Sequence, residues 1–69
     1  LRGEMETLVL AAVADLAPEL RDALTLREVE GLSYDEIAER MQCPIGTVRS
    51  RIFRARDAID ARLKPLLNP

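Results

Sequence analysis

The chain has 69 residues, of which 48% are apolar and 32% charged, and its formal net charge at pH 7 is −2. This length allows one small domain, which buries only about 60% of the surface that its unfolded chain exposes. The composition is typical of a folded helical domain rather than a disordered tail. Three glycines and a single residue each of Tyr and Phe argue against a β-sandwich or barrel.

The first two helices are predicted from the spacing of apolar residues. A helix from about Glu4 to Asp15 carries a stripe that we expect to be core: Met5, Leu8, Val9, Ala12 and Leu16. Leu10 and Val13 widen this stripe and leave room for a partner surface. A second helix begins at Pro18 and runs to about Glu30, with Gly31 as a left-handed cap. Its expected buried positions are Leu20, Ala23, Leu24, Leu26 and Val29.

A short third helix and a long fourth helix follow. Ser33 with Glu36 three residues later is a capping box, and it predicts a helix from Tyr34 to about Met41. A turn at 42–44 ends in proline, which favours the start of a helix, so we expect the fourth helix from about Ile45 to Leu63, fraying before Pro65. The predicted fold class is all-α, a compact four-helix domain. Its last two helices have helix-turn-helix proportions, although an ordinary αα-hairpin is the alternative.

The fourth helix has two different faces. At about 100° per residue, a narrow apolar stripe must face the core; it consists of Val48, Ile52, Ala55 and Ile59. Ser50, Phe53 and Arg54 point the opposite way, with Arg49 and Arg56 on one flank and Arg51 on the other. A phenylalanine on the wet face of a basic helix gains nothing from folding. A thymine methyl group in the major groove of DNA is a natural contact for it.

The distribution of charge supports a nucleic-acid partner despite the acidic total. Residues 1–46 hold ten acidic and four basic side chains, whereas residues 47–69 hold six basic and two acidic ones. The basic end therefore presents a positive field to a duplex, while the acidic remainder weakens non-specific binding. Flanking arginines of a groove-bound helix face the backbone, so Arg49, Arg51 and Arg56 are expected phosphate contacts. Thr47 either caps the helix or touches phosphate.

The segment LTLREVEGLSYDEIAERMQCPIGTVRSRIFRARDAI (24–59) resembles the C-terminal, −35-binding domain (region 4) of bacterial sigma factors. The similarity is to the extracytoplasmic-function type and its sigma-E-like group, and it covers about Leu16 to Leu63. It implies a recognition helix in the major groove of the promoter −35 element, often GGAA-containing. It also implies contact with the β flap of RNA polymerase and masking by an anti-sigma factor.

The resemblance also implies roles for individual residues. Arg49, Ser50, Phe53 and Arg54 match groove-facing positions, and Arg27 matches a backbone-contacting one. Gln42 departs from the usual helix-turn-helix pattern, which has glycine there, so the turn is strained if Gln42 is left-handed.

The remaining expectations concern organisation and chemistry. We expect residues 1–69 to form one domain, with the helix-turn-helix at about 33–61, and the start at Leu1 predicts a piece of a longer two-domain sigma factor. Without histidine, a phosphate loop or a second cysteine to join Cys43, no catalytic residue, cofactor or metal site is expected. The longest apolar run is far below the ~20 residues that span a bilayer. The single cysteine is consistent with a reducing compartment, and the resemblance implies a bacterial protein, so we expect a cytoplasmic location without membrane contact of its own.

Two rival functions remain at this point. One is a LuxR-type regulator domain, which shares the helix-turn-helix scaffold but usually dimerises through its last helix. The other is a helical module that binds a polymerase subunit or an anti-sigma factor without touching DNA. Phe53 and the clustered arginines on one exposed helix favour DNA binding.

Overall fold

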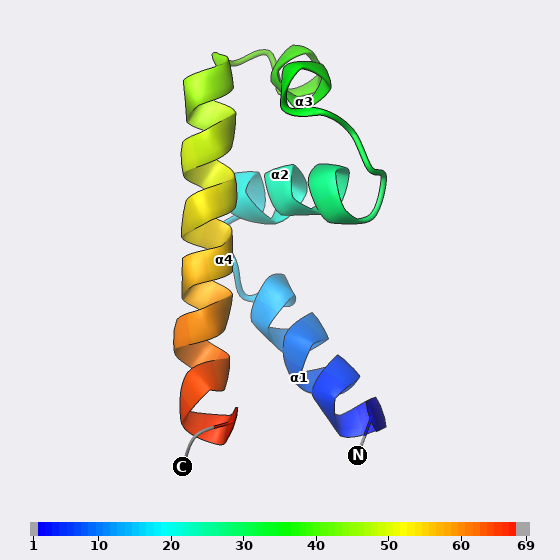
Figure 1. The fold of residues 1–69 in the computed structure, drawn as a ribbon, viewed down its shortest axis with the longest axis vertical. Coiled ribbons are helices and arrows are strands. Elements are labelled where there is room, and N and C mark those ends of the chain that lie inside the picture. The colour runs from blue at the N-terminus through cyan, green and yellow to red at the C-terminus, as the bar shows by residue number, and fades with distance from the viewer. Residues whose placement is uncertain (1, 68–69) are drawn as a thin grey trace.

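The longest helix packs against each of the other three helices. The computed structural model describes residues 2–67, which contain α1 (Arg2–Ala14), α2 (Pro18–Glu28), α3 (Tyr34–Met41) and α4 (Ile45–Leu67) and no strand. In Figure 1, α4 runs the length of the molecule, α1 lies beside its C-terminal half, α2 crosses near its middle and α3 lies at its N-terminal end. The predicted all-α, four-helix fold is confirmed, with dimensions of 39 × 19 × 17 Å.

The core lies where α2, α3 and α4 meet. Its buried members come from all three helices: Ala23, Leu26, Ile37, Val48 and Ile52. A second, smaller cluster joins the connection between α1 and α2 to helices α2 and α4, and it consists of Leu16, Leu24 and Ala55. Burial of one large aliphatic side chain contributes about 1.5–3 kcal/mol. These contacts therefore fix how α4 is rotated about its own axis.

Local signals set the start of α3 and the end of α2. The Ser33 hydroxyl accepts a hydrogen bond from the Glu36 amide at 3.1 Å, and the Glu36 carboxylate accepts one from the Ser33 amide at 2.8 Å, so the predicted capping box is confirmed. Gly31 has a φ of +69°, as expected for a left-handed cap. The helix ends slightly earlier than predicted because the Leu32 amide turns back to the Leu26 carbonyl at 3.1 Å. Val29 is consequently 79% exposed, and its expected burial was wrong.

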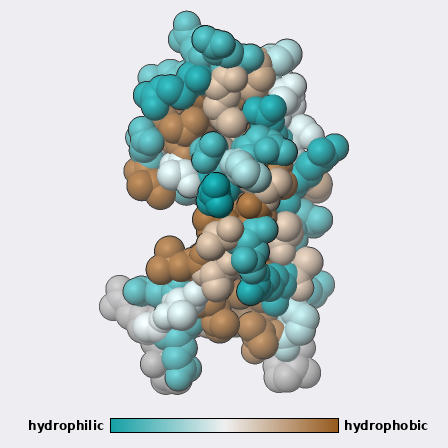
Figure 2. All heavy atoms as spheres, turned by 180° about the vertical axis from the view of Figure 1, so that it is seen from behind, coloured by the Kyte–Doolittle hydropathy of each residue, from teal (hydrophilic) through white to brown (hydrophobic). Residues whose placement is uncertain are grey.

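The N-terminal half of α1 is also different from the expectation. Met5, Leu8 and Val9 are each 36–37% exposed, and only Ala12 and Leu16 of the predicted stripe are buried. The reason is that α1 packs mainly against α4 and meets it with its C-terminal end. Figure 2 shows hydrophobic surface, in brown, on both the upper and the lower half of the molecule. The helix itself begins and ends one or two residues before the predicted bounds.

The C-terminal end of α4 extends past the predicted stop at Leu63 to Leu67, and Pro65 lies inside it. Proline has no amide hydrogen, so the Ala61 carbonyl loses its helical partner. Ala61 lies on an exposed stretch of the helix, where water can take the place of that partner. No helix within residues 2–67 has the length and apolar character required to cross a membrane.

Candidate nucleic-acid interface

The buried stripe of α4 determines which of its side chains face outward. Val48, Ile52 and Ala55 are at most 1% exposed, as the angular spacing predicted. On the opposite side, Phe53 keeps 71% of its surface exposed, and Ser50 beside it is exposed as well. An aromatic ring in this position adds almost nothing to the core. The predicted assignment of the two faces is therefore confirmed, and the outward face is free to contact a ligand.

The turn between α3 and α4 aims this face. Gln42 is left-handed, with φ 54° and ψ 52°, and its amide donates to the carbonyls of Ala38 and Glu39. The Cys43 amide also donates to the Ala38 carbonyl, at 3.0 Å. Pro44 directly precedes α4. Its carbonyl accepts the first hydrogen bonds of the helix, from the amides of Thr47 at 2.9 Å and Val48 at 3.2 Å. Gln42 is thus left-handed, the condition under which the turn was expected to be strained, at a position where glycine would avoid that strain.

Two arginines of the outward face are available to an anion. Arg49 and Arg54 are both exposed, and neither forms an ion pair with a carboxylate in residues 2–67. Arg54 lies at one side of an open recess of about 590 Å³, together with Ser50 and the half-buried Thr47. The other wall of the recess is formed by Ala17, just before α2, and by Glu19 and Leu20 in its first turn. The first turns of α4 and the start of α2 thus form one continuous surface.

Arg51 is held against the turn. It is half-buried, and its Nη1 lies 3.7 Å from the Cys43 sulfur and 4.0 Å from the Met41 sulfur. Sulfur is a weak acceptor, so most of the donors of the guanidinium stay available. Cys43 packs partly buried against the main core cluster, as expected of a small turn residue.

Arg56 is engaged by a neighbouring helix. Its guanidinium forms an ion pair and hydrogen bond with the carboxylate of Glu28, at the end of α2. The hydrogen bond to Glu28 raises the pKa of Arg56, with a smaller contribution from the attraction of the two charges. Both side chains remain about half exposed. The sequence contained no signal for this contact, because the partners are 28 residues apart and meet only through the packing of α2 on α4.

Arg27 holds the loop between α2 and α3. Its Nη1 donates to the Leu32 carbonyl at 3.0 Å, and its guanidinium carbon lies 5.2 Å from the centroid of the Tyr34 ring. Stacking on the ring orients the guanidinium without consuming its remaining donors. Arg27 thus lies at the loop between α2 and α3, Arg56 pairs with the end of α2, and Arg51 contacts the turn between α3 and α4.

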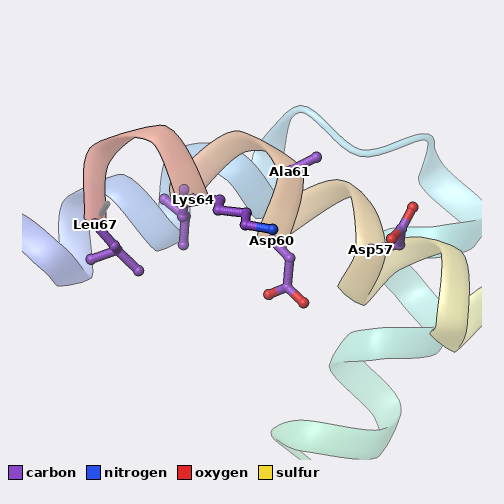
Figure 3. Close-up of a pocket in the computed structure, with 6 residues that line it drawn as sticks. Asp57, Asp60, Ala61, Lys64 and Leu67 are labelled. Carbon is purple, nitrogen blue, oxygen red and sulfur yellow. The ribbon is translucent and has the colours of Figure 1, made fainter. Parts of the chain in front are cut away.

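A different hollow lies on the C-terminal half of α4, away from these residues. It measures about 560 Å³ and is lined by residues of α4 alone: Asp57, Asp60, Ala61, Leu63, Lys64 and Leu67. Figure 3 labels all of these except Leu63. A hollow along one helix has no opposite wall, so it does not enclose a ligand. Within the described residues, the acidic side chains and the cysteine form no group of three suited to a metal ion.

Helices α3 and α4 with their short turn form a helix-turn-helix, and comparison with known families specifies its type. The family described as "Sigma-70, region 4" matches residues 6–59, so the chain belongs to this family. The predicted resemblance is thereby confirmed, and the match argues against the LuxR-type alternative.

Individual relatives agree with the family. The chain is 64% identical over 67 residues to the RNA polymerase sigma-H factor of Pseudomonas aeruginosa, an alignment that covers 97% of this chain and 35% of that protein. It is 54% identical to the ECF RNA polymerase sigma-E factor of Haemophilus influenzae and 55% identical to that of Escherichia coli K12, with the same coverage. The chain thus spans about a third of the length of these curated relatives.

Proposed function

We propose that this domain recognises the −35 element of promoters as part of a sigma factor, and so directs RNA polymerase to the start of transcription. The observation that carries the proposal is the outward face of α4, where Phe53 is 71% exposed beside arginines that have no carboxylate partner in residues 2–67. The major groove of DNA, about 12 Å wide, admits a helix, and the arginine fork matches O6 and N7 of guanine. The domain binds DNA and carries out no reaction of its own.

The residues of α4 divide into two roles by their position on the helix. Ser50, Phe53 and Arg54, at the centre of the outward face, contact base edges. Arg49 enters the groove beside them, at the flank where its guanidinium also reaches a phosphate. The DNA backbone is contacted from the sides of the helix by four further residues: Arg27, Thr47, Arg51 and Arg56.

Protein partners complete the proposed function. The domain is one part of a longer two-domain sigma factor and binds the β flap of RNA polymerase. Support comes from α1, where Leu10 is 68% exposed next to Met5 and Val9, an apolar surface that the described residues leave uncovered. An anti-sigma factor competes for the same surfaces.

If α1 binds the β flap, Leu10→Glu will weaken binding to core polymerase and leave binding to a −35 duplex unchanged. Binding of this variant to polymerase with the wild-type affinity would exclude the α1 surface as the flap contact.

The experiment that tests DNA recognition is a selection of bound duplexes from a randomised pool, made with the full-length protein and core polymerase. The proposal predicts enrichment of a short motif that contains consecutive guanines. Recovery of an unbiased pool by a polymerase complex that contains the protein would contradict it. Such a result would favour the alternative of a protein-interaction module without DNA contact.

A further inference from the structure

The ion pair between Arg56 and Glu28 is exposed and includes a proposed phosphate contact. Glu28 ends α2 and Arg56 lies on α4, so the ion pair joins two helices that pack against each other. The side chains are each 51% exposed. A phosphate can therefore approach Arg56 from solvent, and when it does it also approaches the carboxylate of Glu28.

Arg56 is unlike the other arginines of the proposed DNA surface. Arg49, Arg51 and Arg54 form no ion pair with a carboxylate within residues 2–67, and the hydrogen-bond contacts of Arg51 there are to two sulfur atoms. A guanidinium offers five donors in a fixed plane, and those that point at a carboxylate cannot point at a phosphate. The negative charge beside it opposes the same phosphate. Both effects are independent of the sequence of the bases, because every duplex presents the same backbone.

We propose that Glu28 is a positioning residue that restrains Arg56 and so lowers the affinity of the protein for the DNA backbone without changing its preference among bases. This inference rests on the proposed function. Through this restraint, an acidic residue limits non-specific binding to the DNA backbone. Discrimination between base sequences then depends on the outward face of α4. Glu28 itself contacts neither bases nor phosphates.

The test compares Glu28→Gln with the wild-type full-length protein on two labelled duplexes, one with the −35 motif and one with the motif shuffled. Loss of the carboxylate should raise affinity for both duplexes by the same factor, roughly two- to five-fold, as for an exposed charge pair. The slope of log affinity against log salt should steepen by up to about 0.9, the share of one phosphate. The melting temperature should stay nearly unchanged, because an exposed ion pair adds little to folding.

Two further variants identify the cause. Glu30→Gln removes the same charge from a nearby pair with Arg40, 3.9 Å long and of similar exposure, and it should change binding much less. In the Arg56→Ala background, Glu28→Gln should have a much smaller effect, because only the repulsion between the carboxylate and the phosphate is then left to remove. An equal gain in that background would mean that Glu28 acts only through its overall charge, and the proposal would be wrong.

The remaining outcomes are also decisive. Unchanged or weaker binding by Glu28→Gln contradicts the restraint, and an altered base preference would make Glu28 a base-reading residue instead. Wild-type preference for the −35 duplex is measured in the same titrations. Its absence would overturn the proposed function, whereas its presence without a Glu28→Gln effect would overturn this inference alone.

Discussion

Ile52 and Phe53 are consecutive residues of α4 with opposite surroundings, since Ile52 is 1% exposed and Phe53 71%. Ile52→Ala should therefore lower the free energy of unfolding by about 2–5 kcal/mol, the usual result of truncating a core isoleucine. Phe53→Ala should leave it nearly unchanged, because the ring has few contacts to lose. Thermal or denaturant melts of the two variants test this contrast. A large drop for Phe53→Ala would show that the ring is core.

Binding by the same Phe53 variant is expected to fall. Removal of the ring eliminates an apolar contact to base methyl groups, together with the exclusion of water around it. The melting curve and the binding curve of Phe53→Ala should therefore diverge. If both stay at the wild-type level, the ring has no role in recognition.

Arg54 is the residue that we expect to read a guanine. Arg54→Ala should lose about 1–3 kcal/mol on the −35 duplex and relax the preference at one base position. On a shuffled duplex the loss should be smaller, because only the general attraction of a positive charge is removed. Titrations of both duplexes measure the difference. Equal losses would assign Arg54 to the backbone.

At the scale of elements, the start of α3 depends on the capping box. Ser33→Ala removes the acceptor of the Glu36 amide, and the loss of such a cap lowers the free energy of unfolding by about 1 kcal/mol. Ser33→Asp retains an acceptor at the same position and should restore most of the loss. A chemical denaturation series with both variants tests the prediction, and equal stability of Ser33→Ala and wild type would contradict it.

The same cap predicts a dependence on pH. The hydrogen bond from the Ser33 amide is the main cause that holds the pKa of Glu36 below its ordinary value of 4.5. A group whose pKa is lowered by folding stabilises the fold above its unfolded pKa, and loses this contribution as the pH falls through the folded value. Wild type should thus lose more stability than Glu36→Gln between about pH 6 and pH 3. Identical pH profiles would show that the Glu36 carboxylate is not held.

Features set by neighbouring residues could be predicted from the sequence. The capping box, the left-handed Gly31 and the rotation of α4 all depend on spacings of a few residues, and the structure confirms each of them. The outward position of Phe53 followed from the same helical spacing, as did the exposure of Arg54.

Features that depend on packing could not be predicted. The stripe on α1 showed that Leu8 and Val9 share one face, but whether another helix covers that face depends on the arrangement of the whole chain. The pairs of Arg56 with Glu28 and of Arg62 with Asp15 join residues 28 and 47 positions apart. No local pattern indicates such contacts. For Arg56 this matters to the site, because Arg56 is also a proposed phosphate contact.

At the scale of the whole molecule, the charge distribution predicts how binding depends on salt. Each arginine that neutralises a phosphate contributes about 0.9 to the slope of log affinity against log salt. Arg49→Ala should lower that slope by this amount on every duplex, because Arg49 has no carboxylate partner in residues 2–67. Arg56→Ala should lower it by less while Glu28 is present. A full slope in the Arg49 variant would mean that Arg49 does not contact the backbone.

Recognition of the −35 element can be measured as the ratio of two affinities of the full-length protein at one salt concentration. One duplex contains the GGAA motif of a −35 element, and the other has that motif shuffled. Each mismatched base pair in a recognised site weakens binding by about 1–3 kcal/mol. A single mismatch at the middle of that range, about 2 kcal/mol, lowers the affinity about 30-fold, so shuffling the motif should lower it by at least this factor. Equal affinity for the two duplexes would contradict the account, because the outward face of α4 would then bind DNA without reading its sequence.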